Sequence, residues 1–506
     1  MTQGDVRDNP FGLLVVFGLW LCLLPRLATA QEPTLFAGNL SLSLGVDTQT
    51  EDPLEDMADL RSRVDLDLRH PLGDGVRTRL AARLWHRALV GHEGDYEPAF
   101  TEDWPAFGTR HDSAAELREA YLQWHRPWGT LILGQDLVQW GALELQSPFR
   151  ILNAMDYRSG LTGAMSEDSL AIPELMLRFQ RKVGEDGALD LVYLPFFSQH
   201  RFSPFGTDTA IVRPGLGPQQ PLAMVSMLRR ADLRLDRTLA EVLVNALEPP
   251  PAAPWAGSLG ARYGLRLGDW DLAGVAIWNW DRLPELAFDA DIATVLGAFT
   301  GAGFDQGKQV AAFTRPDVLA ASERLNGSGK TLADLVQATW RRRVVLGVEA
   351  TVSPAEGWIL RSDAAFSPSQ VFIDQALAPF RSPLVQAGAG AEYAHEDWLV
   401  ALVEWSWQYV LDVPAGRKPF LLARHHHVLG GGLRAMLGEG QPWTLQLGGM
   451  WGVSLGDWAV APEVGYAMAE NWTAAVGATL SGGPVDSPGG LTAQDDQGVV
   501  RVRRAF

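Results

Sequence analysis

The feature that most constrains this chain is a period-two alternation of polar and apolar side chains, which recurs in short segments along its length. In residues 35–47, the apolar side chains of Leu40, Leu42 and Leu44 alternate with small or polar ones. Successive side chains of a β-strand point to opposite faces, so such segments predict strands with one apolar face. That face could cover a soluble core or meet lipid, and one strand leaves both readings open.

Two neighbouring predicted strands carry a dense stripe of charge on one face. In residues 60–70 the stripe consists of Arg61, Arg63, Asp65, Asp67 and Arg69, and in residues 76–89 it consists of Arg77, Arg79, Arg83 and Arg87. An arginine facing lipid at the bilayer midplane costs about 2–4 kcal/mol, so in a barrel these side chains would line the lumen. In a soluble sheet they would form the solvent face.

The same alternation predicts about eighteen strands, an even number as bacterial barrels require. They lie near residues 35–47, 60–70, 76–89, 114–126, 128–136, 172–183, 187–196, 255–267, 269–279, 341–353, 357–367, 385–394, 397–409, 422–437, 442–454, 457–468, 471–480 and 497–506.

The connections between these segments alternate in length. Tight, turn-like connections such as 71–75, 184–187, 354–357 and 438–442 alternate with longer ones, above all 90–113, 137–171, 197–254 and 280–340. Short turns on one side and long loops on the other are typical of outer-membrane barrels, whereas a soluble sandwich has no reason to sort its loops. The pattern therefore predicts an all-β fold, a transmembrane antiparallel up-and-down β-barrel with long extracellular loops.

Composition agrees with this reading and excludes other classes of protein. The net charge of −18 argues against a nucleic-acid partner. After the N-terminal segment no run of apolar residues is long enough for a transmembrane helix, yet 47% of residues are hydrophobic and there are 19 tryptophans. Several aromatic residues recur near predicted strand ends, as interface girdles would, and the chain ends on Phe506. A C-terminal phenylalanine predicts recognition by the barrel assembly machinery, although Arg504 departs from the usual apolar residue.

Residues 1–30 are expected to be a signal peptide that is cleaved after Ala30. An apolar run from Phe11 to Leu24 precedes a small-residue stretch that ends at Ala30, although the segment before the run is acidic rather than basic. The run is too short for a retained membrane anchor. The only cysteine, Cys22, lies within it, so the mature chain, residues 31–506, would have no thiol for a disulfide or a metal site.

Three segments carry a resemblance to a known family: 134–158, 172–178 and 193–197. They resemble an uncharacterised family of proteobacterial porin-like outer-membrane proteins that has only a domain-of-unknown-function label. The matching residues are Trp140, Gly141, Asn153, Asp156 and Arg158, and Ala154 stands where the family has proline. The resemblance implies a barrel, traffic of small or hydrophobic molecules, cooperation with an inner-membrane efflux system and no catalytic site.

Two tempting motifs predict no chemistry. Residues 326–331 read NGSGKT, but Arg324 occupies the position of the first glycine of a phosphate-binding loop. His425, His426 and His427 are consecutive, so in a strand the middle ring faces away from the other two and the three cannot share a metal ion. We expect no cofactor and no metal.

Two long connections are candidates for a pore constriction. Residues 140–158 combine aromatic anchors with Asp156 and Arg158, and we expect this segment to fold into the lumen. Residues 286–339 read as helical around 290–299, 316–325 and 332–340, and could enter the lumen, cap the outside or form an external loop. The predicted lumen-lining residues are Arg77, Arg79, Arg83, Arg87, Asp156, Arg158 and Arg178.

A porin-like channel or export conduit in the outer membrane, among lipid and lipopolysaccharide, is the function that these features favour. Opposed charges across a pore would set a transverse field that sorts permeants by charge. A structural or adhesive barrel with a plugged lumen is one alternative. A lipase-type barrel enzyme is another, but it needs a lipid-facing serine and histidine, and the sequence offers no convincing pair.

Overall fold

A computed structural model describes most of the chain after its N-terminal segment. The described residues are 34–48, 58–90, 110–157, 170–201, 253–282, 284–300, 311–312, 314–329, 336–374, 379–484, 487–492 and 496–506. The expected signal peptide lies outside them.

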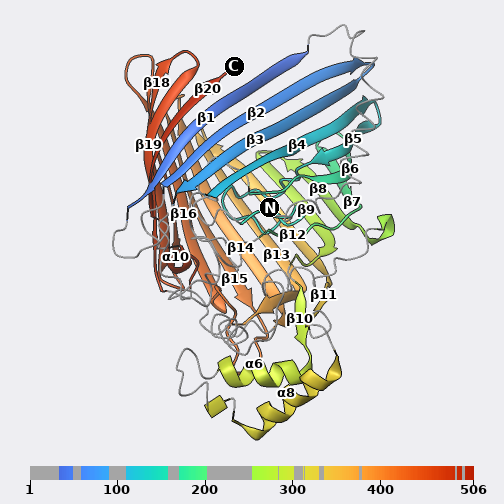
Figure 1. Ribbon diagram of the computed structural model, residues 1–506. Coiled ribbons are helices and arrows are strands. Elements are labelled where there is room, and N and C mark those ends of the chain that lie inside the picture. Colours follow the sequence, from blue (N-terminus) through green and yellow to red (C-terminus); the bar gives the residue numbers. More distant parts are fainter. Residues whose placement is uncertain are drawn as a thin grey trace.

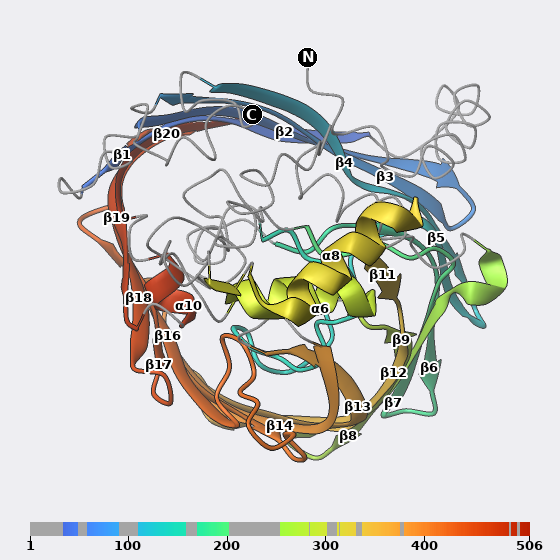
Figure 2. The same cartoon turned by 60° about the horizontal axis from the view of Figure 1, so that its bottom comes forward.

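The chain folds into one antiparallel sheet of 18 strands that closes on itself as a barrel (Figures 1 and 2). The predicted fold class is confirmed. The strands are β1 Leu35–Asp47, β2 Ala58–Gly73, β3 Val76–Val90, β4 Arg110–Arg126, β5 Gly129–Asp136, β6 Glu174–Val183, β7 Gly187–Leu194, β8 Ser258–Leu267, β9 Trp270–Trp280, β12 Arg342–Ala355, β13 Trp358–Ile373, β14 Pro379–His395, β15 Leu399–Val410, β16 His425–Leu437, β17 Trp443–Gly452, β18 Asp457–Ala469, β19 Trp472–Gly482 and β20 Gln497–Ala505.

The barrel closes where the first strand pairs with the last. β1 pairs with β2 on one side and with β20 on the other, in register from Asn39 opposite Ala505. Beyond this ladder, Gly38 N donates to Phe506 O at 2.9 Å and Phe506 N donates to Gly38 O at 3.0 Å. A Cβ on Gly38 would lie 2.7 Å from the Phe506 ring, so glycine lets the terminal ring lie against the seam.

The outward face of the strands is an apolar belt bounded by aromatic side chains. Leu42, Leu84 and Val348 are 51%, 47% and 59% exposed on this face, as lipid contact requires. Near the two rims lie exposed aromatic side chains of the predicted girdles, which pack in pairs such as Trp443 and Tyr466, with ring centroids 4.6 Å apart. The alternation in the sequence is thus apolar toward lipid and polar toward the lumen.

The short turns lie at one rim, and the strand ends that the long connections join lie at the other. The turns use left-handed glycines, such as Gly75 (φ 75°) and Gly357 (φ 76°), which adopt this conformation at no steric cost. The connection from β9 to β12 extends beyond the other rim as the strands β10 Glu285–Phe288 and β11 Val336–Thr339 and the helices α6 Ala290–Thr300 and α8 Pro316–Ser328.

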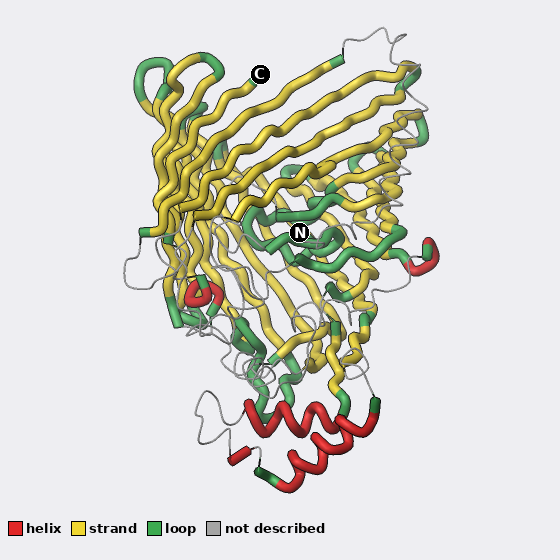
Figure 3. Tube along the Cα trace, in the orientation of Figure 1, coloured by secondary structure: helices red, strands yellow, loops and turns green. Residues whose placement is uncertain are grey.

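The two helices cap one end of the barrel. They lie beyond the strand ends in Figures 1 and 3 and cross the mouth in Figure 2. Two further short elements are η2 Pro254–Ala256 and α10 Pro488–Leu491. Among the described helices, none has the length and apolar character needed to cross a membrane.

One predicted helix is wrong. Residues 332–340 read as helical, but Val336–Thr339 forms β11, which pairs with β10 from Glu285 opposite Thr339 to Phe288 opposite Val336. Pairing with a distant segment overrides the weak local preference for a helix. The hairpin of β13 and β14 also extends six residues beyond the predicted end at 367, to Ile373, where Phe372 stacks on Phe380.

The seam predicts a graded effect of changes at the C-terminus. Deleting Phe506 removes two backbone hydrogen bonds and the ring, whereas Phe506→Ala removes only the ring. We expect the folded fraction, measured as the fast-migrating band on unheated gels, to fall in the order wild type, Phe506→Ala, deletion. An unchanged folded fraction in the deletion variant would show that the seam does not need this residue.

Candidate functional site

A segment that leaves β5 lies inside the barrel rather than outside it. We call residues 137–157 the lumenal segment; its trace crosses the barrel interior in Figure 2. The side chains of Leu143, Phe149 and Leu152 are 0% exposed. Phe149 and Leu152 belong to an apolar cluster that the segment forms with strands of the wall: Val138, Trp140, Phe149, Leu152, Met176, Val192, Leu194, Val275, Ile277, Val345 and Ala365. The lumenal segment is therefore packed against the wall as firmly as a protein core.

Glycines of the wall make room for the apolar side chains of the lumenal segment. A Cβ added to any of four lumen-facing glycines would lie within 2.6–2.7 Å of a side-chain atom of the segment. The pairs are Gly260 beneath Trp140, Gly347 beneath Phe149, Gly388 beneath Leu143, and Gly430 beneath Leu145. Glycine in a strand often marks a close approach, and here it marks the path of the segment along the wall.

Three carboxylates of the wall bind the backbone of the segment. Glu349 on β12 accepts from Gly141 N at 3.0 Å. Asp363 on β13 accepts from Ala142 N at 2.9 Å and from Leu143 N at 3.2 Å, and Glu404 on β15 accepts from Glu144 N at 2.6 Å and Leu145 N at 2.8 Å. Hydrogen bonds to an ionised group are the strong ones, so they fix the course of the backbone and satisfy the buried carboxylates.

The end of the segment near β6 is held by a buried ion pair. Arg282 and Glu174 are each 5% exposed, with Nη2 and Oε2 3.0 Å apart. Arg282 also donates to Leu152 O, and Glu174 accepts from Ala154 N at 3.2 Å. Asn153 accepts from Val138 N at 2.8 Å. A buried pair of this kind is costly to break, because the remaining charge would have no partner.

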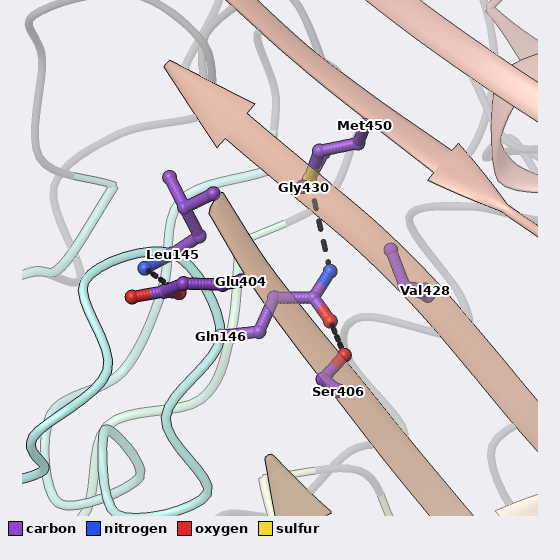
Figure 4. A pocket seen from close by; sticks show the side chains of 7 residues that line it. All are labelled: Leu145, Gln146, Glu404, Ser406, Val428, Gly430 and Met450. Atoms are coloured by element: carbon purple, nitrogen blue, oxygen red, sulfur yellow. Dashed lines mark hydrogen bonds between the residues drawn. The ribbon is translucent and has the colours of Figure 1, made fainter. Parts of the chain in front are cut away.

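The middle of the segment reaches the wall opposite β5. Gln146 donates through Nε2 to Met450 Sδ on β17 at 3.7 Å and accepts through Oε1 from Ser406 Oγ on β15. Figure 4 shows these side chains around a small pocket, which is lined by Leu145, Gln146, Glu404, Ser406, Val428, Gly430 and Met450. Two residues before Gln146, the side chain of Glu144 is 52% exposed, 3.7 Å from Arg361 and 3.6 Å from Arg150.

The arginines of β3 lie on the lumen face, and most are paired. Leu84, between them, is 47% exposed on the lipid side. Three arginines bind carboxylates of β2 and β4: Arg79 binds Asp67 at 2.9 Å and Glu119 at 2.5 Å, Arg83 binds Asp65 at 2.8 Å, and Arg87 binds Asp59 at 2.9 Å. Arg77 is exposed and forms no ion pair within the described chain. The face is thus a ladder of paired charges, which has a weaker field than four isolated cations.

The remaining residues that the sequence predicted to line the lumen are Arg178, Asp156 and Arg158. Arg178 lies on the lumen face and binds Asp190 at 2.7 Å, and the same carboxylate accepts from Trp140 Nε1 at 3.0 Å. Arg178 therefore anchors the lumenal segment. Asp156 lies 3.9 Å from Arg201, and Arg158, its predicted counterpart, lies outside the described residues.

Two titratable groups beside the segment are perturbed by burial. The pKa of His200 is lowered to about 3, chiefly by burial and also by the nearby Arg282 and Arg343. The neutral ring accepts from Met155 N at 2.9 Å. Burial raises the pKa of Asp281 to about 6, although Arg343, 3.5 Å away, opposes the shift.

The sequence interpretation missed the wall carboxylates. Glu349, Asp363 and Glu404 are single acidic residues at lumen-facing strand positions, and Asp363 and Glu404 face glycines on neighbouring strands, Gly388 and Gly430. A single acidic residue on the lumen face of one strand, opposite a glycine on the next strand, is the signal that could have located the lumenal segment.

The three consecutive histidines alternate as predicted. His426 is 7% exposed on the lumen side, and His425 and His427 lie on the outward side. Within the described chain no group of three or more metal-ligating side chains is close enough to hold an ion.

A serine and a histidine do meet on the lipid face, contrary to expectation. His86 on β3 and Ser113 on β4 are paired across the strands, with Nδ1 and Oγ 2.7 Å apart and both side chains exposed. The sequence did not predict this pair, because the two residues lie on strands joined by a long connection.

Comparison with known proteins gives only distant structural likenesses. No protein-family model and no curated protein match the chain. Among solved structures, an OmpF of Salmonella typhi in complex with daunomycin aligns at a TM-score of 0.39 and 8% identity, covering 94% of this chain and 97% of that one. OccAB3 of Acinetobacter baumannii aligns at 0.44 and 8%, covering 94% and 99%. OpdK of Pseudomonas aeruginosa with vanillate aligns at 0.43 and 8%, covering 94% and 98%.

The fold and the site together define a class of protein: an 18-stranded transmembrane β-barrel with a segment docked inside its lumen.

The glycines beneath the lumenal segment predict that two substitutions on the same strand, β16, change the stability of the barrel by different amounts. A Cβ on Gly430 would lie 2.7 Å from Leu145 Cδ1, whereas a Cβ on Gly432, two residues further on the same face, has only Leu447 O at 3.9 Å nearby. Gly430→Val should therefore lower the free energy of unfolding by about 1–3 kcal/mol, because overpacking displaces the segment. Gly432→Val should change it by less than about 0.5 kcal/mol.

Urea unfolding in micelles, followed by tryptophan fluorescence, measures both variants. Equal losses of unfolding free energy would mean that the segment does not rest on this glycine.

Proposed function

We propose that this protein is a porin-like channel of a bacterial outer membrane, whose permeation path is narrowed by the lumenal segment. The observation that carries the proposal is the course of that segment, from β5 to the wall at β17, held by carboxylates and glycines that have no role in closing the barrel. A barrel that only anchored itself in a membrane would not need an element fixed along its inner wall.

The charges on the two walls support a transverse field. β3 and β14 are the third and twelfth of the 18 strands around the barrel, nine apart in either direction, so they face each other across the lumen. The ladder of arginine ion pairs is on the β3 side, and Glu144 is exposed on the β14 side. Charges placed on opposite walls sort permeants by charge and dipole.

The apolar belt, the closed sheet and the sorted loops favour the outer membrane, since barrels of this kind cross bacterial outer membranes. The family resemblance of residues 134–158 adds two further proposals: traffic of small or hydrophobic molecules, and cooperation with an inner-membrane efflux system. Conductance in planar bilayers separates a channel from a plugged structural barrel, because only an open lumen conducts.

Charge-neutralising variants test the field, with opposite signs expected. Asp65→Asn with Asp67→Asn leaves Arg79 and Arg83 without their β2 partners and should shift the reversal potential in a salt gradient toward anion preference. Arg79→Gln with Arg83→Gln should shift it toward cation preference. Asp269→Asn, in the turn between β8 and β9, is the control and should leave it unchanged.

Selectivity that stays constant in both double variants would remove these charges from the permeation path. A folded wild-type protein that never conducts would contradict the channel itself.

A second candidate function is hydrolysis of lipid esters at the outer surface, favoured only by the pair His86 and Ser113. In such a reaction Ser113 Oγ would attack the ester carbonyl and pass its proton to His86, and the alcohol would leave with that proton, which gives an acyl-serine. Water, deprotonated by His86, would then attack the acyl-serine, and the carboxylic acid would leave as Ser113 Oγ takes the proton back from the ring. A fluorophosphonate probe should then label the folded protein, and Ser113→Ala should abolish the label. Absence of labelling in the wild type would reduce the pair to a hydrogen bond between strands.

A further inference from the structure

An aromatic and cationic cluster lies on the outside of the barrel where β15 ends and β16 begins. We call it the rim cluster; it comprises Trp405, Trp407, Tyr409, Arg424, His425 and His427. Tyr409 and His425 stack with ring centroids 4.1 Å apart, and Trp405 and His427 stack at 5.9 Å. The cluster is therefore an ordered surface and not a set of separate side chains.

The rim cluster faces outward at the rim of the long connections. Val403 and Leu429 lie on the same strand faces and are 55% and 39% exposed, whereas Glu404 and His426, on the opposite faces, are 3% and 7% exposed. The short turn between β14 and β15 lies at the other rim. Tryptophan and tyrosine rings suit the edge of a lipid belt, whereas the imidazole and guanidinium groups among them need polar partners there.

Hydrogen-bond donors of the cluster remain available. Arg424 uses Nε toward Val410 O at 3.4 Å and Nη2 toward Leu411 O at 2.7 Å and Tyr409 Oη at 3.5 Å. These bonds leave the two N–H groups of Nη1. Trp405 Nε1 donates to His427 Nδ1 at 3.3 Å, so the proton of the neutral ring is on Nε2.

His425 is exposed, and its ring makes no hydrogen bond to any described residue. Three side chains therefore offer donors at one edge of the belt, and the guanidinium supplies a permanent positive charge.

We propose that the rim cluster binds a phosphate group of a phosphorylated glycolipid, lipopolysaccharide, in the outer leaflet. Arg424 and the histidines donate to the phosphate, since charge-assisted bonds to phosphate are strong. The faces of Trp405 and Trp407 pack against sugar rings. The alanines beside them on the lipid face of β14, opposite Trp405 and Trp407 in register, leave room for acyl chains: Ala387 and Ala389.

The choice of lipopolysaccharide rests on the proposed function, because that proposal places the long connections on the outer side. A phospholipid phosphate would meet the same donors but would bring no sugar to the tryptophans. The aromatic rings therefore favour the glycolipid over a phospholipid of the same charge.

Native mass spectrometry of the refolded full-length mature barrel tests the site. The protein is mixed with lipopolysaccharide or, separately, with phosphatidylglycerol. The triple variant Arg424→Gln, His425→Gln, His427→Gln should retain about tenfold less lipopolysaccharide than wild type, because it loses the charge-assisted bonds. Arg126→Gln is the matched control, since Arg126 lies 5.0 Å above the ring of Trp124 at the opposite rim. It should bind like wild type.

Arg424→Lys alone, which keeps the positive charge, should retain most of the binding. Heat-modifiable migration of each variant checks that the barrel is folded. Phosphatidylglycerol meets the same donors without a sugar on the tryptophans, so the wild type should bind it more weakly than lipopolysaccharide. Unchanged lipopolysaccharide binding in the folded triple variant, an equal loss in Arg126→Gln, or wild-type binding of phosphatidylglycerol as strong as that of lipopolysaccharide would each overturn the proposal.

The assay needs no conductance. A barrel that binds lipopolysaccharide through the rim cluster but never conducts would contradict the channel and leave this site standing, and the converse result would remove only the site.

Discussion

The pairing of every backbone N–H and C=O group is the constraint on which this structure depends. Hydrocarbon offers no hydrogen bonds, so a sheet can cross it only when it has no free edge. Here the first and last strands pair over their length, and the terminal Phe506 adds two backbone bonds to Gly38 beyond the ladder. Once the sheet is closed, the period of two sends one face of every strand to lipid and the other to the lumen.

Closure makes the lumen face available for function. The lipid face must be apolar around the whole barrel, whereas the lumen face can carry charge, glycine or bulk at any position. The lumenal segment uses this freedom: Glu349, Asp363 and Glu404 bind its backbone, and glycines such as Gly388 let its side chains approach. A segment held by both backbone and side chains is a fixed part of the wall rather than a loop that moves in the pore.

The sequence predicted the strands well because their signal is local. A period of two over about ten residues needs no knowledge of the partner strand, and the tight turns carry glycines that adopt left-handed backbone. The anchors of the lumenal segment could not be predicted in this way, since Gly141 and Glu349 are 208 residues apart. The same reason explains β11, whose strand character comes from β10, and the pair His86 and Ser113, which meets only after β3 and β4 align.

The electric field in the lumen depends on how charged side chains pair on neighbouring strands, and not on the net charge of the chain. The chain has a formal charge of −18, yet three arginines of β3 bind carboxylates on neighbouring strands, so neither the total nor the count of arginines describes the field that a permeant would meet. A paired ladder still presents alternating donors and acceptors along the wall, which suits dipolar solutes as well as ions. On the opposite wall, the half-exposed carboxylate of Glu144 lies 3.6 Å from Arg150 and 3.7 Å from Arg361, so a permeant would meet paired charges on that side as well. Glu144 is held in this position because its own backbone amide and that of Leu145 donate to Glu404 on the wall.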